Sequence, residues 1–240
     1  MGYQIATAAL GPLLIWQGRG VRRRTPRLPE AAGDRTGVAG NGHALRLVVL
    51  GDSSAAGVGV QTQAQALVGQ TVGALAGRYR VSWELVAATG MTTRGMIMQL
   101  ERRPADRYDI ALTALGVNDV TRRRPVTTWL AEQRNLWDIL RTRFGTSRII
   151  VSGLPPVHVF PALPQPLRWY LGAHAKRLDR ALRRIVAGEP DCHFVDLHQL
   201  KDRSAMAADG FHPGADAYTW WGRTVAAAID HGMRYARDDL

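Results

Sequence analysis

The sequence predicts an α/β domain in which a mostly parallel β-sheet carries helices on both faces. Two observations support this fold class. Short apolar runs alternate with longer segments whose apolar residues recur at helical spacing, and most of the short runs end at or near a glycine. Right-handed crossovers between parallel strands then distribute the helices over both faces of the sheet.

The length of 240 residues suits one domain, or one domain with an extension. A chain of this length buries enough apolar surface to fold without disulfides, and with Cys192 as the only cysteine an internal disulfide is excluded. No apolar run reaches the roughly 18 residues that a membrane-spanning helix needs.

Residues 1–44 are predicted to be an N-terminal apolar helix and a basic linker, followed by the main domain over residues 45–240. The stretch from Tyr3 to Trp16 is mostly apolar, and the basic run Arg22-Arg23-Arg24 follows it. A cleavable signal peptide has the opposite order of charge and apolar residues, so none is predicted. Two alternatives stay open: a helix packed on the domain or a partner, and an interfacial membrane helix with a basic flank. Residues 25–42 are rich in Pro, Gly, Ala and charge and are predicted to be a linker.

Five short apolar runs are predicted to be strands, and four periodic segments are predicted to be helices. The strands are Leu45–Leu50, Val81–Ala87, Asp109–Leu115, Arg148–Ser152 and Cys192–Leu197. The helices are Gln61–Arg78, Pro125–Phe144, Pro166–Ala187 and Ala215–His231. Pro125 suits the first turn of its helix, because the N–H that proline lacks has no intrahelical partner there.

In open α/β sheets, sites form beyond the carboxyl ends of the strands. The first strand is followed by Gly51-Asp52-Ser53, where a serine on a sharp turn would project its hydroxyl above the sheet. Such a hydroxyl needs a base within hydrogen-bond reach to act as a nucleophile. The alternative is that Asp52 or Ser53 caps the following helix. Gly57-Val58-Gly59 does not complete a dinucleotide-binding motif.

Two more strand ends offer hydrogen-bond donors. Asn118, in Gly116-Val117-Asn118-Asp119, follows the third strand and could donate its side-chain amide into the same crevice, or form an Asx-turn. Asp119 is expected to support its own loop. Gly90 follows the second strand, and its backbone N–H can approach a ligand closely because glycine has no side chain.

One of the seven histidines stands immediately before the last predicted helix. It is His212, in the segment Asp209-Gly210-Phe211-His212-Pro213. A spacing of three residues lets the carboxylate of Asp209 meet the imidazole, fix its tautomer and stabilise its charged form. The alternative is that both residues cap the helix that follows.

Together these four segments resemble the SGNH hydrolases, also called GDSL esterases or lipases. Gly51-Asp52-Ser53 is similar to the first block of that family, and Gly90 to the glycine of the second. The Gly116–Asp119 segment is similar to the third block, and the Asp209–Pro213 segment to the last. The resemblance extends from about Leu45 to Ile229.

The resemblance implies a flavodoxin-like three-layer α/β/α sandwich with a five-stranded parallel sheet. It also implies that Ser53 is the nucleophile, that His212 takes its proton, and that Asp209 orients the imidazole. The oxyanion hole would be formed by the backbone N–H groups of Ser53 and Gly90 and by the side-chain amide of Asn118. This chemistry needs no metal and no organic cofactor.

The sequence departs from the family pattern at two positions. Ser54 stands where the family usually has leucine after its serine, which is expected to change packing rather than chemistry. Ala88 stands where the family usually has an asparagine two residues before its glycine. The hydrogen bonds that fix the Gly90 loop must therefore come from elsewhere.

The net charge of +11 is compatible with an anionic partner, but the arginines are scattered in pairs and triplets, as expected of solvated faces. The predicted activity is hydrolysis of a carboxylic ester in the cytoplasm, with a small-molecule ester as the partner and no nucleic acid. Peripheral membrane contact through the N-terminal segment is a further expectation. One alternative is a carbohydrate O-acetylesterase on the same fold. Another is a basic membrane-surface or nucleic-acid binding module without catalysis.

The sequence does not identify the substrate-binding residues. The proline-rich, apolar stretch Gly153–Trp169 is predicted to be either a lip of the crevice or a rigid surface connection. Met91, Met96 and Met98 are predicted to belong to the core or to an apolar binding face.

Overall fold

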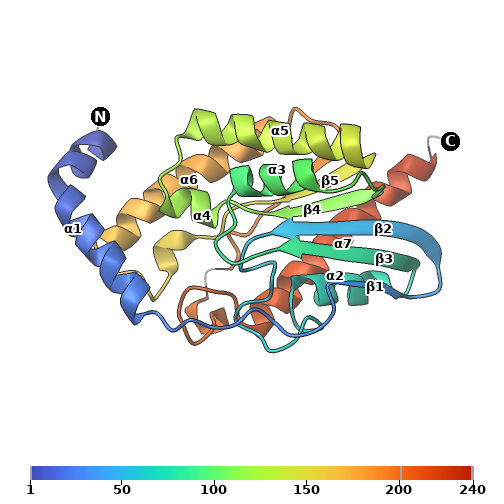
Figure 1. The fold of residues 1–240 in the computed structure, drawn as a ribbon, viewed down its shortest axis with the longest axis horizontal. Helices are drawn as coiled ribbons and strands as arrows, with labels where there is room; N and C mark the ends of the chain where they lie inside the picture. Colours follow the sequence, from blue (N-terminus) through green and yellow to red (C-terminus); the bar gives the residue numbers. More distant parts are fainter. Residues whose placement is uncertain (1, 201, 239–240) are drawn as a thin grey trace.

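The computed structural model, which describes residues 2–200 and 202–238, contains one six-stranded sheet between two layers of helices (Figure 1). The strands are β1 (Thr36–Ala39), β2 (His43–Gly51), β3 (Tyr79–Ala87), β4 (Ile110–Ala114), β5 (Arg148–Ser152) and β6 (Cys192–Val195). Their order across the sheet is β1-β3-β2-β4-β5-β6. Strands β2 to β6 are parallel, which confirms the predicted parallel sheet. The order places a topological switch point between β2 and β4, where ligands bind in such folds.

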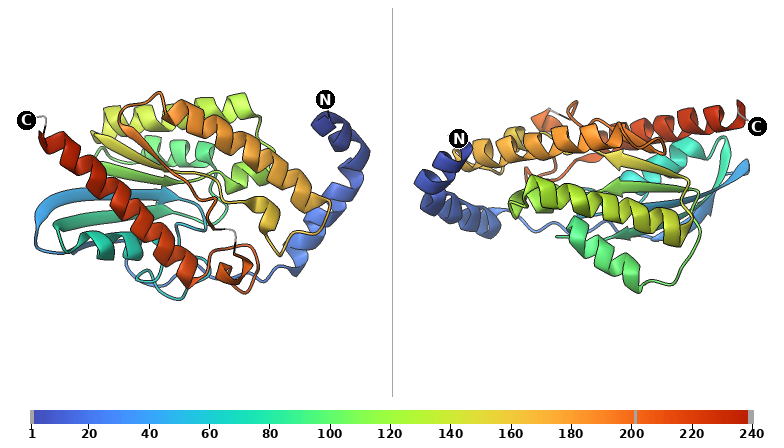
Figure 2. Two further views of the ribbon diagram at one scale, coloured as in Figure 1. Left: turned by 180° about the vertical axis from the view of Figure 1, so that it is seen from behind. Right: turned by 90° about the horizontal axis from the view of Figure 1, so that it is seen from above.

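The helices cover both faces of the sheet, so the predicted three-layer sandwich is confirmed (Figure 2). They are α1 (Gly2–Arg24), α2 (Leu67–Leu75), α3 (Thr93–Arg102), α4 (Val117–Thr121), α5 (Val126–Phe144), α6 (Leu167–Val186) and α7 (Ala215–Asp238), with the short 3₁₀ turns η1 (Val157–Val159) and η2 (Arg203–Ala205). Helices α2 and α7 pack on one face, and α3, α5 and α6 pack on the other.

The core consists of two apolar layers, one on each side of the sheet. In β2, Val48 and Leu50 face the layer of α3, α5 and α6, whereas Leu47 and Val49 face α2 and α7. All residues of β4 are buried. Burying one such side chain contributes about 1.5–3 kcal/mol, so both faces of the central strands must be apolar for the sandwich to be stable. This requirement explains why these strands were recognisable as continuous apolar runs.

The predicted number of five strands is wrong, because the sheet has a sixth strand within the predicted linker of residues 25–42. This strand, β1, pairs antiparallel with β3 at the edge of the sheet. Its residues alternate between exposed and half-buried, and Val38 is 55% exposed. An edge strand with so little burial needs no apolar run, so composition alone indicated a loop.

Several helices also differ from the prediction. Helix α2 begins at Leu67 rather than Gln61, because Gln61 and Gln63 hydrogen-bond through their backbones to Ala32 instead of continuing a helix. Helix α3 was not predicted, and within it Met96 is fully buried in the core while Met98 is exposed. The last helix continues beyond His231 to Asp238.

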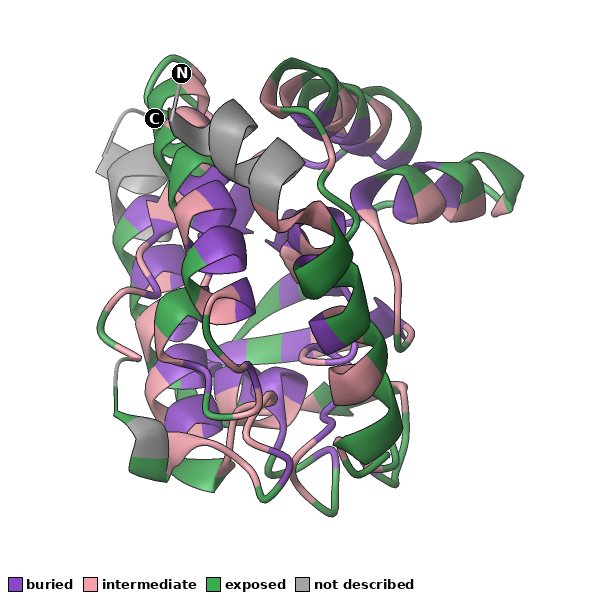
Figure 3. Cartoon of the chain, turned by 90° about the vertical axis from the view of Figure 1, so that its left-hand side faces the viewer, coloured by how far each residue is buried: buried purple, intermediate pink, exposed green. Residues whose placement is uncertain are grey.

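Helix α1 packs along the amino-terminal end of α6, as both views of the ribbon show (Figure 2). Leu14 is buried there, and the side chain of Gln17 donates to the carbonyl of Gln165 at 2.6 Å and accepts from the N–H of Leu167 at 3.0 Å. Buried and exposed residues therefore follow one another along this helix (Figure 3). Of the two predicted alternatives, packing on the domain is present in the structure. Among the described helices, none is both long and apolar enough to cross a membrane.

Candidate active site

Ser53 lies on a tight turn just beyond the end of β2. The turn is fixed by backbone hydrogen bonds from Asp52 N–H to the carbonyl of Ala114 and from Val58 N–H to the carbonyl of Ser53. A side chain at Gly51 would have its Cβ 2.2 Å from the Cβ of Ala55, so only glycine lets the chain turn this closely. The hydroxyl of Ser53 is thereby held at the carboxyl edge of the sheet, as the sequence predicted.

Ser53, His212 and Asp209 form a continuous chain of hydrogen bonds. The Nε2 atom of His212 lies 2.8 Å from the Oγ of Ser53, although the two residues are 159 positions apart. The Nδ1 atom of His212 lies 2.5 Å from Oδ2 of Asp209. Because the carboxylate of Asp209 favours the tautomer with the proton on Nδ1, Nε2 is left free to accept the proton of the serine hydroxyl.

Asp209 is held in place and kept ionised. Its Oδ1 accepts from the backbone N–H groups of Phe211 and His212 at 2.9 and 3.0 Å. Burial by itself would raise the pKa of Asp209, but the hydrogen bonds from His212 and from these N–H groups outweigh it and lower the pKa below 3.8. An ionised carboxylate in this position orients the imidazole and stabilises it when it is protonated.

The last helix holds the serine turn against the histidine loop. The hydroxyl of Tyr218, at the start of α7, donates at 2.8 Å to the carbonyls of Ser54 and Val58. Gly59, with φ of +108°, lies so close to the loop that a Cβ there would be 2.2 Å from the carbonyl oxygen of Pro213. These contacts fix the position of Ser53 relative to His212.

The predicted donor Asn118 lines the same cavity as Ser53 and connects to the segment that carries Gly90. The Nδ2 of Asn118 donates to the carbonyl of Met91 at 3.0 Å and to Oδ2 of Asp52 at 3.4 Å, so this amide lies between the segments that carry Gly90 and Ser53. Gly90 has φ of +83° and open space where a side chain would project. The backbone N–H groups of Ser53 and Gly90 donate to no residue within the described ranges.

Asp52 is a buried carboxyl beside this amide. Burial raises the pKa of Asp52 to about 6, against the opposing effects of the hydrogen bond from the N–H of Ser54 and the charge of His212. Asp52 holds the turn through its contacts with Ser54 and Asn118.

Asp119 supports the loop that presents Asn118, as predicted. Its Oδ2 accepts from the N–H and the hydroxyl of Thr93 at 3.1 and 3.0 Å. The hydroxyl of Thr93 in turn accepts from Nε1 of Trp129 and from Nε2 of Gln133. Burial raises the pKa of Asp119. This network anchors α4 to α3 and α5.

Two residues that sequence reasoning missed hold the Gly90 loop. Oε1 of Glu30 accepts from the N–H and the hydroxyl of Thr89 at 2.7 and 2.8 Å. Its Oε2 pairs with Arg35 at 2.5 Å, and Arg35 also donates to the carbonyl of Ala87 at 2.6 Å. The Glu30–Arg35 pair thus supplies hydrogen bonds on both sides of Ala88, the position at which the family usually carries an asparagine. The only signal in the sequence was the missing asparagine itself.

An apolar cavity of about 50 Å³ opens beside Ser53. Its walls include Leu154, Pro155 and Phe160 from the proline-rich stretch. This stretch therefore lines the crevice, which agrees with the first of its two predicted roles. Phe211 also lines this cavity, and its ring contacts those of Phe160 and His212 at centroid distances of 5.2 and 5.3 Å. Across residues 2–200 and 202–238, no group of three His, Cys, Asp or Glu side chains is placed to hold a metal ion.

Fold and geometry together define a class: doubly wound α/β proteins with a serine–histidine–aspartate chain of hydrogen bonds at the carboxyl edge of a parallel sheet. Residues 49–220 match the model of the GDSL-like lipase/acylhydrolase family. The chain belongs to this family, which confirms the resemblance found in the sequence.

One relative agrees with this assignment, and two solved structures have a similar fold. The GDSL-like esterase Rv1075c of Mycobacterium tuberculosis is 28% identical over 185 residues; the match covers 72% of this chain but only 58% of the relative. The structure is similar to that of the psychrotrophic esterase EstA from Pseudoalteromonas sp., with 18% identity, a TM-score of 0.62 and coverage of 79% and 98% of the two chains. It is also similar to a catalytic mutant of the acetylxylan esterase Axe2 from Geobacillus stearothermophilus, with 20% identity, a TM-score of 0.56 and coverage of 79% and 95%.

Proposed function

We propose that the protein is a serine hydrolase that cleaves carboxylic esters with Ser53, His212 and Asp209 as its catalytic residues. The observation that carries the proposal is the pair of contacts on the imidazole, 2.8 Å to Ser53 and 2.5 Å to Asp209. An alcohol becomes a nucleophile at neutral pH when a base lies within hydrogen-bond reach and a third group orients that base.

In the proposed reaction, Oγ of Ser53 attacks the carbonyl carbon of the ester while Nε2 of His212 takes the hydroxyl proton. The tetrahedral intermediate collapses, its bond to the alcohol oxygen breaks, and His212 returns the proton to the departing alcohol. A water molecule then gives a proton to His212 and attacks the acyl-enzyme. The carboxylic acid leaves, and the proton returns from His212 to Ser53.

The negative charge on the carbonyl oxygen needs donors during both tetrahedral stages. The N–H groups of Ser53 and Gly90 support this role because no described residue accepts from them. Asn118 would supply the third donor by exchanging its contact with the carbonyl of Met91 for one with the oxyanion. Removing one such donor typically lowers turnover by about 10²–10³-fold.

The small apolar cavity beside Ser53 favours a short acyl group at this position. This observation also supports the second candidate function, removal of acetyl groups from a carbohydrate. The two differ in the alcohol: a simple or apolar alcohol in one case, and a sugar hydroxyl in the other.

The test is to measure hydrolysis of p-nitrophenyl esters from acetate to decanoate, and of acetylated xylan, by the wild-type chain. Ser53→Ala and His212→Asn should abolish hydrolysis, while Ser147→Ala, at an exposed serine remote from the site, should not change it. Circular dichroism checks that each variant is folded. Hydrolysis by folded Ser53→Ala at the wild-type rate would refute the proposal. Acetylated xylan as the better substrate would select the carbohydrate esterase.

A further inference from the structure

A second cavity, larger than the one beside Ser53, lies between α1, the end of α4 and α6. Its volume is about 470 Å³, within the range of small-molecule sites. Much of its wall is apolar and includes Leu14 and Ile15 from α1 and Leu167, Tyr170 and Leu171 from α6. We call this cavity the α1 groove.

The α1 groove adjoins the catalytic centre. Asn118 and Phe211 line both the α1 groove and the cavity beside Ser53. Asn118 is the proposed oxyanion donor, and the ring of Phe211 packs against that of His212. An ester whose carbonyl lies at Ser53 can therefore extend one of its two arms along the α1 groove.

The rim of the α1 groove is strongly basic. Four arginines line it, and no aspartate or glutamate is among its lining residues. They are Arg19, Arg22, Arg122 and Arg123. All four are exposed, and none forms an ion pair with a described residue. Because guanidinium groups bind carboxylate and phosphate with two parallel hydrogen bonds, such a rim favours an anionic group over a neutral one.

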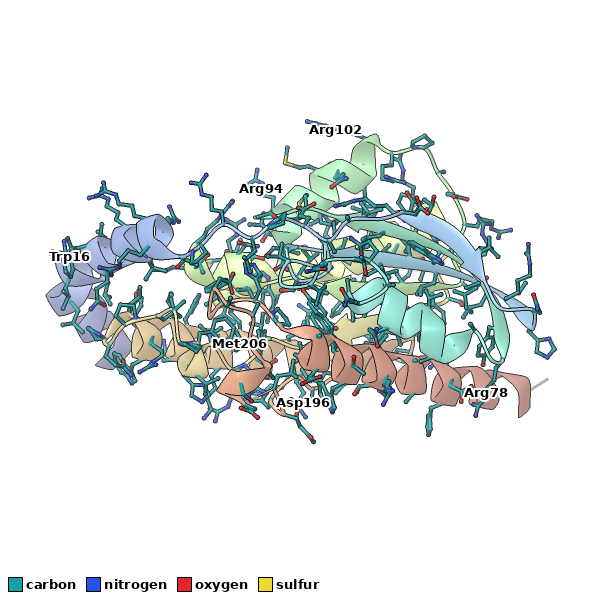
Figure 4. All side chains as sticks on the ribbon, turned by 90° about the horizontal axis from the view of Figure 1, so that it is seen from below. Trp16, Arg78, Arg94, Arg102, Asp196 and Met206 are labelled. Atoms are coloured by element: carbon teal, nitrogen blue, oxygen red, sulfur yellow. The ribbon has the colours of Figure 1, made fainter. Side chains whose placement is uncertain are left out.

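The wall formed by α1 is fixed to the rest of the chain. Gln17 bonds to the backbone at Gln165 and Leu167, and Leu14 is buried against the core that α6 shares. The opposite side of α1 faces solvent, where Trp16 is 67% exposed and lies at one end of the molecule (Figure 4). The groove is thus a built concavity rather than a gap beside a loose segment.

We propose that the α1 groove binds the longer arm of the substrate, and that this arm is an apolar chain bearing a carboxylate, phosphate or sulfate. The proposal rests on the proposed ester hydrolysis and narrows its substrate class. The apolar wall accounts for the chain. The four exposed arginines, of which Arg122 also donates to the carbonyl of Gly90 at 3.3 Å, account for the negative charge. The concave shape and its contact with Asn118 favour a single ester molecule over a membrane surface.

The test measures binding without turnover, by calorimetry on the full chain carrying Ser53→Ala. The probes are decyl phosphate and decyl maltoside, each below its micelle concentration. Decyl phosphate should bind at least about tenfold more tightly, and 0.5 M NaCl should remove most of that difference, because exposed charges are screened. When Arg19→Gln and Arg22→Gln are added to the Ser53→Ala chain, the affinity for decyl phosphate should fall by about three- to tenfold, the range expected for two exposed charge pairs. The affinity for decyl maltoside should not change.

The matched control instead adds Arg80→Gln on β3 and Arg102→Gln at the end of α3. Both arginines are exposed and neither lines the groove, so binding should not change. Figure 4 shows Arg102 on α3, far from Trp16 on α1. Equal affinity for the two probes, or equal loss in the two double variants, would overturn the proposal. So would binding to vesicles of anionic lipid without binding to monomeric decyl phosphate. These binding measurements do not depend on hydrolysis of p-nitrophenyl acetate, which is assayed separately. A wrong proposal for the α1 groove can therefore be distinguished from a wrong proposal for ester hydrolysis.

Discussion

Replacing Glu30 by alanine should slow catalysis without touching any catalytic residue. Glu30 lies in a segment that composition marks as a linker, yet its carboxylate accepts two hydrogen bonds from Thr89, next to Gly90. Without it, Thr89 bonds to water, and the loop is no longer held in the position that directs the N–H of Gly90 to the proposed oxyanion. We therefore treat Glu30 as a positioning residue.

The magnitude follows from these contacts. A hydrogen bond to a charged group contributes about 1.5–3 kcal/mol, and the lower value applies because the side chain of Glu30 is 31% exposed. About 1.4 kcal/mol corresponds to a tenfold change, so kcat should fall about tenfold. The upper limit is the loss of roughly 10²–10³-fold for a completely missing oxyanion donor. Glu30→Gln keeps an acceptor for Thr89 and should lose less.

The assay is the steady-state hydrolysis of p-nitrophenyl acetate, with the melting temperature measured in parallel. A lost transition-state contact lowers kcat and leaves KM nearly unchanged. Partial burial would raise the pKa of Glu30, but the hydrogen bonds from Thr89 and the charge of Arg35 lower it below 4.5. The contribution of Glu30 is therefore present above pH 4.5 and lost only as the pH falls through its lowered pKa, so the defect should be constant from pH 6 to 9.

Asp34→Ala, which removes an exposed carboxylate from the same segment, is the matched control and should retain wild-type kcat. The reasoning about the Gly90 loop is refuted if Glu30→Ala keeps wild-type kcat, or if only KM changes.

Three further predictions concern the site and its supports. Asn118→Ala should lower kcat by about 10²–10³-fold, and steady-state kinetics showing less than about a threefold loss would remove Asn118 from the oxyanion hole. The pKa of buried Asp52, about 6 against 3.8 when exposed, means that ionisation destabilises the fold as the pH rises through 6. Asp52→Asn should therefore gain about 2–3 kcal/mol relative to the wild type between pH 4 and pH 7, and urea unfolding curves with a constant difference would contradict this. Gly59→Ala places a Cβ 2.2 Å from the carbonyl of Pro213 at φ of +108°. It should cost about 1–3 kcal/mol and lower activity by displacing His212; an unchanged melting temperature would show that the loop adapts.

Sequence reasoning predicted the parts of the fold whose structure depends on residues close to one another in the sequence. Strands buried on both faces must be apolar throughout, so β4 and β5 were visible as short apolar runs. The turn after β2 was recognisable because Gly51 is required where the chain passes close to Ala55. The site motifs were predictable for a similar reason: those of Ser53, Gly90 and Asn118 follow strands that the sequence marks clearly, and that of His212 directly precedes a clearly periodic helix.

The parts that sequence reasoning missed depend on contacts between distant segments. Strand β1 is held only by its pairing with β3, and its own residues are half-exposed. Glu30 and Arg35 act on the loop near Gly90 only because β1 brings their segment beside β3. The position of α1 rests on Gln17, a polar residue bonded to backbone atoms near the start of α6, which no apolar periodicity reveals.

The most direct test of the account is to label the wild-type chain with a fluorophosphonate and to locate the adduct by mass spectrometry of its peptides. One adduct is expected, on Ser53, and it should form at a rate that falls sharply in Asp209→Asn because the imidazole is then no longer held toward the serine. An adduct on a different serine, or labelling of Ser53 that is indifferent to both His212→Asn and Asp209→Asn, would contradict it.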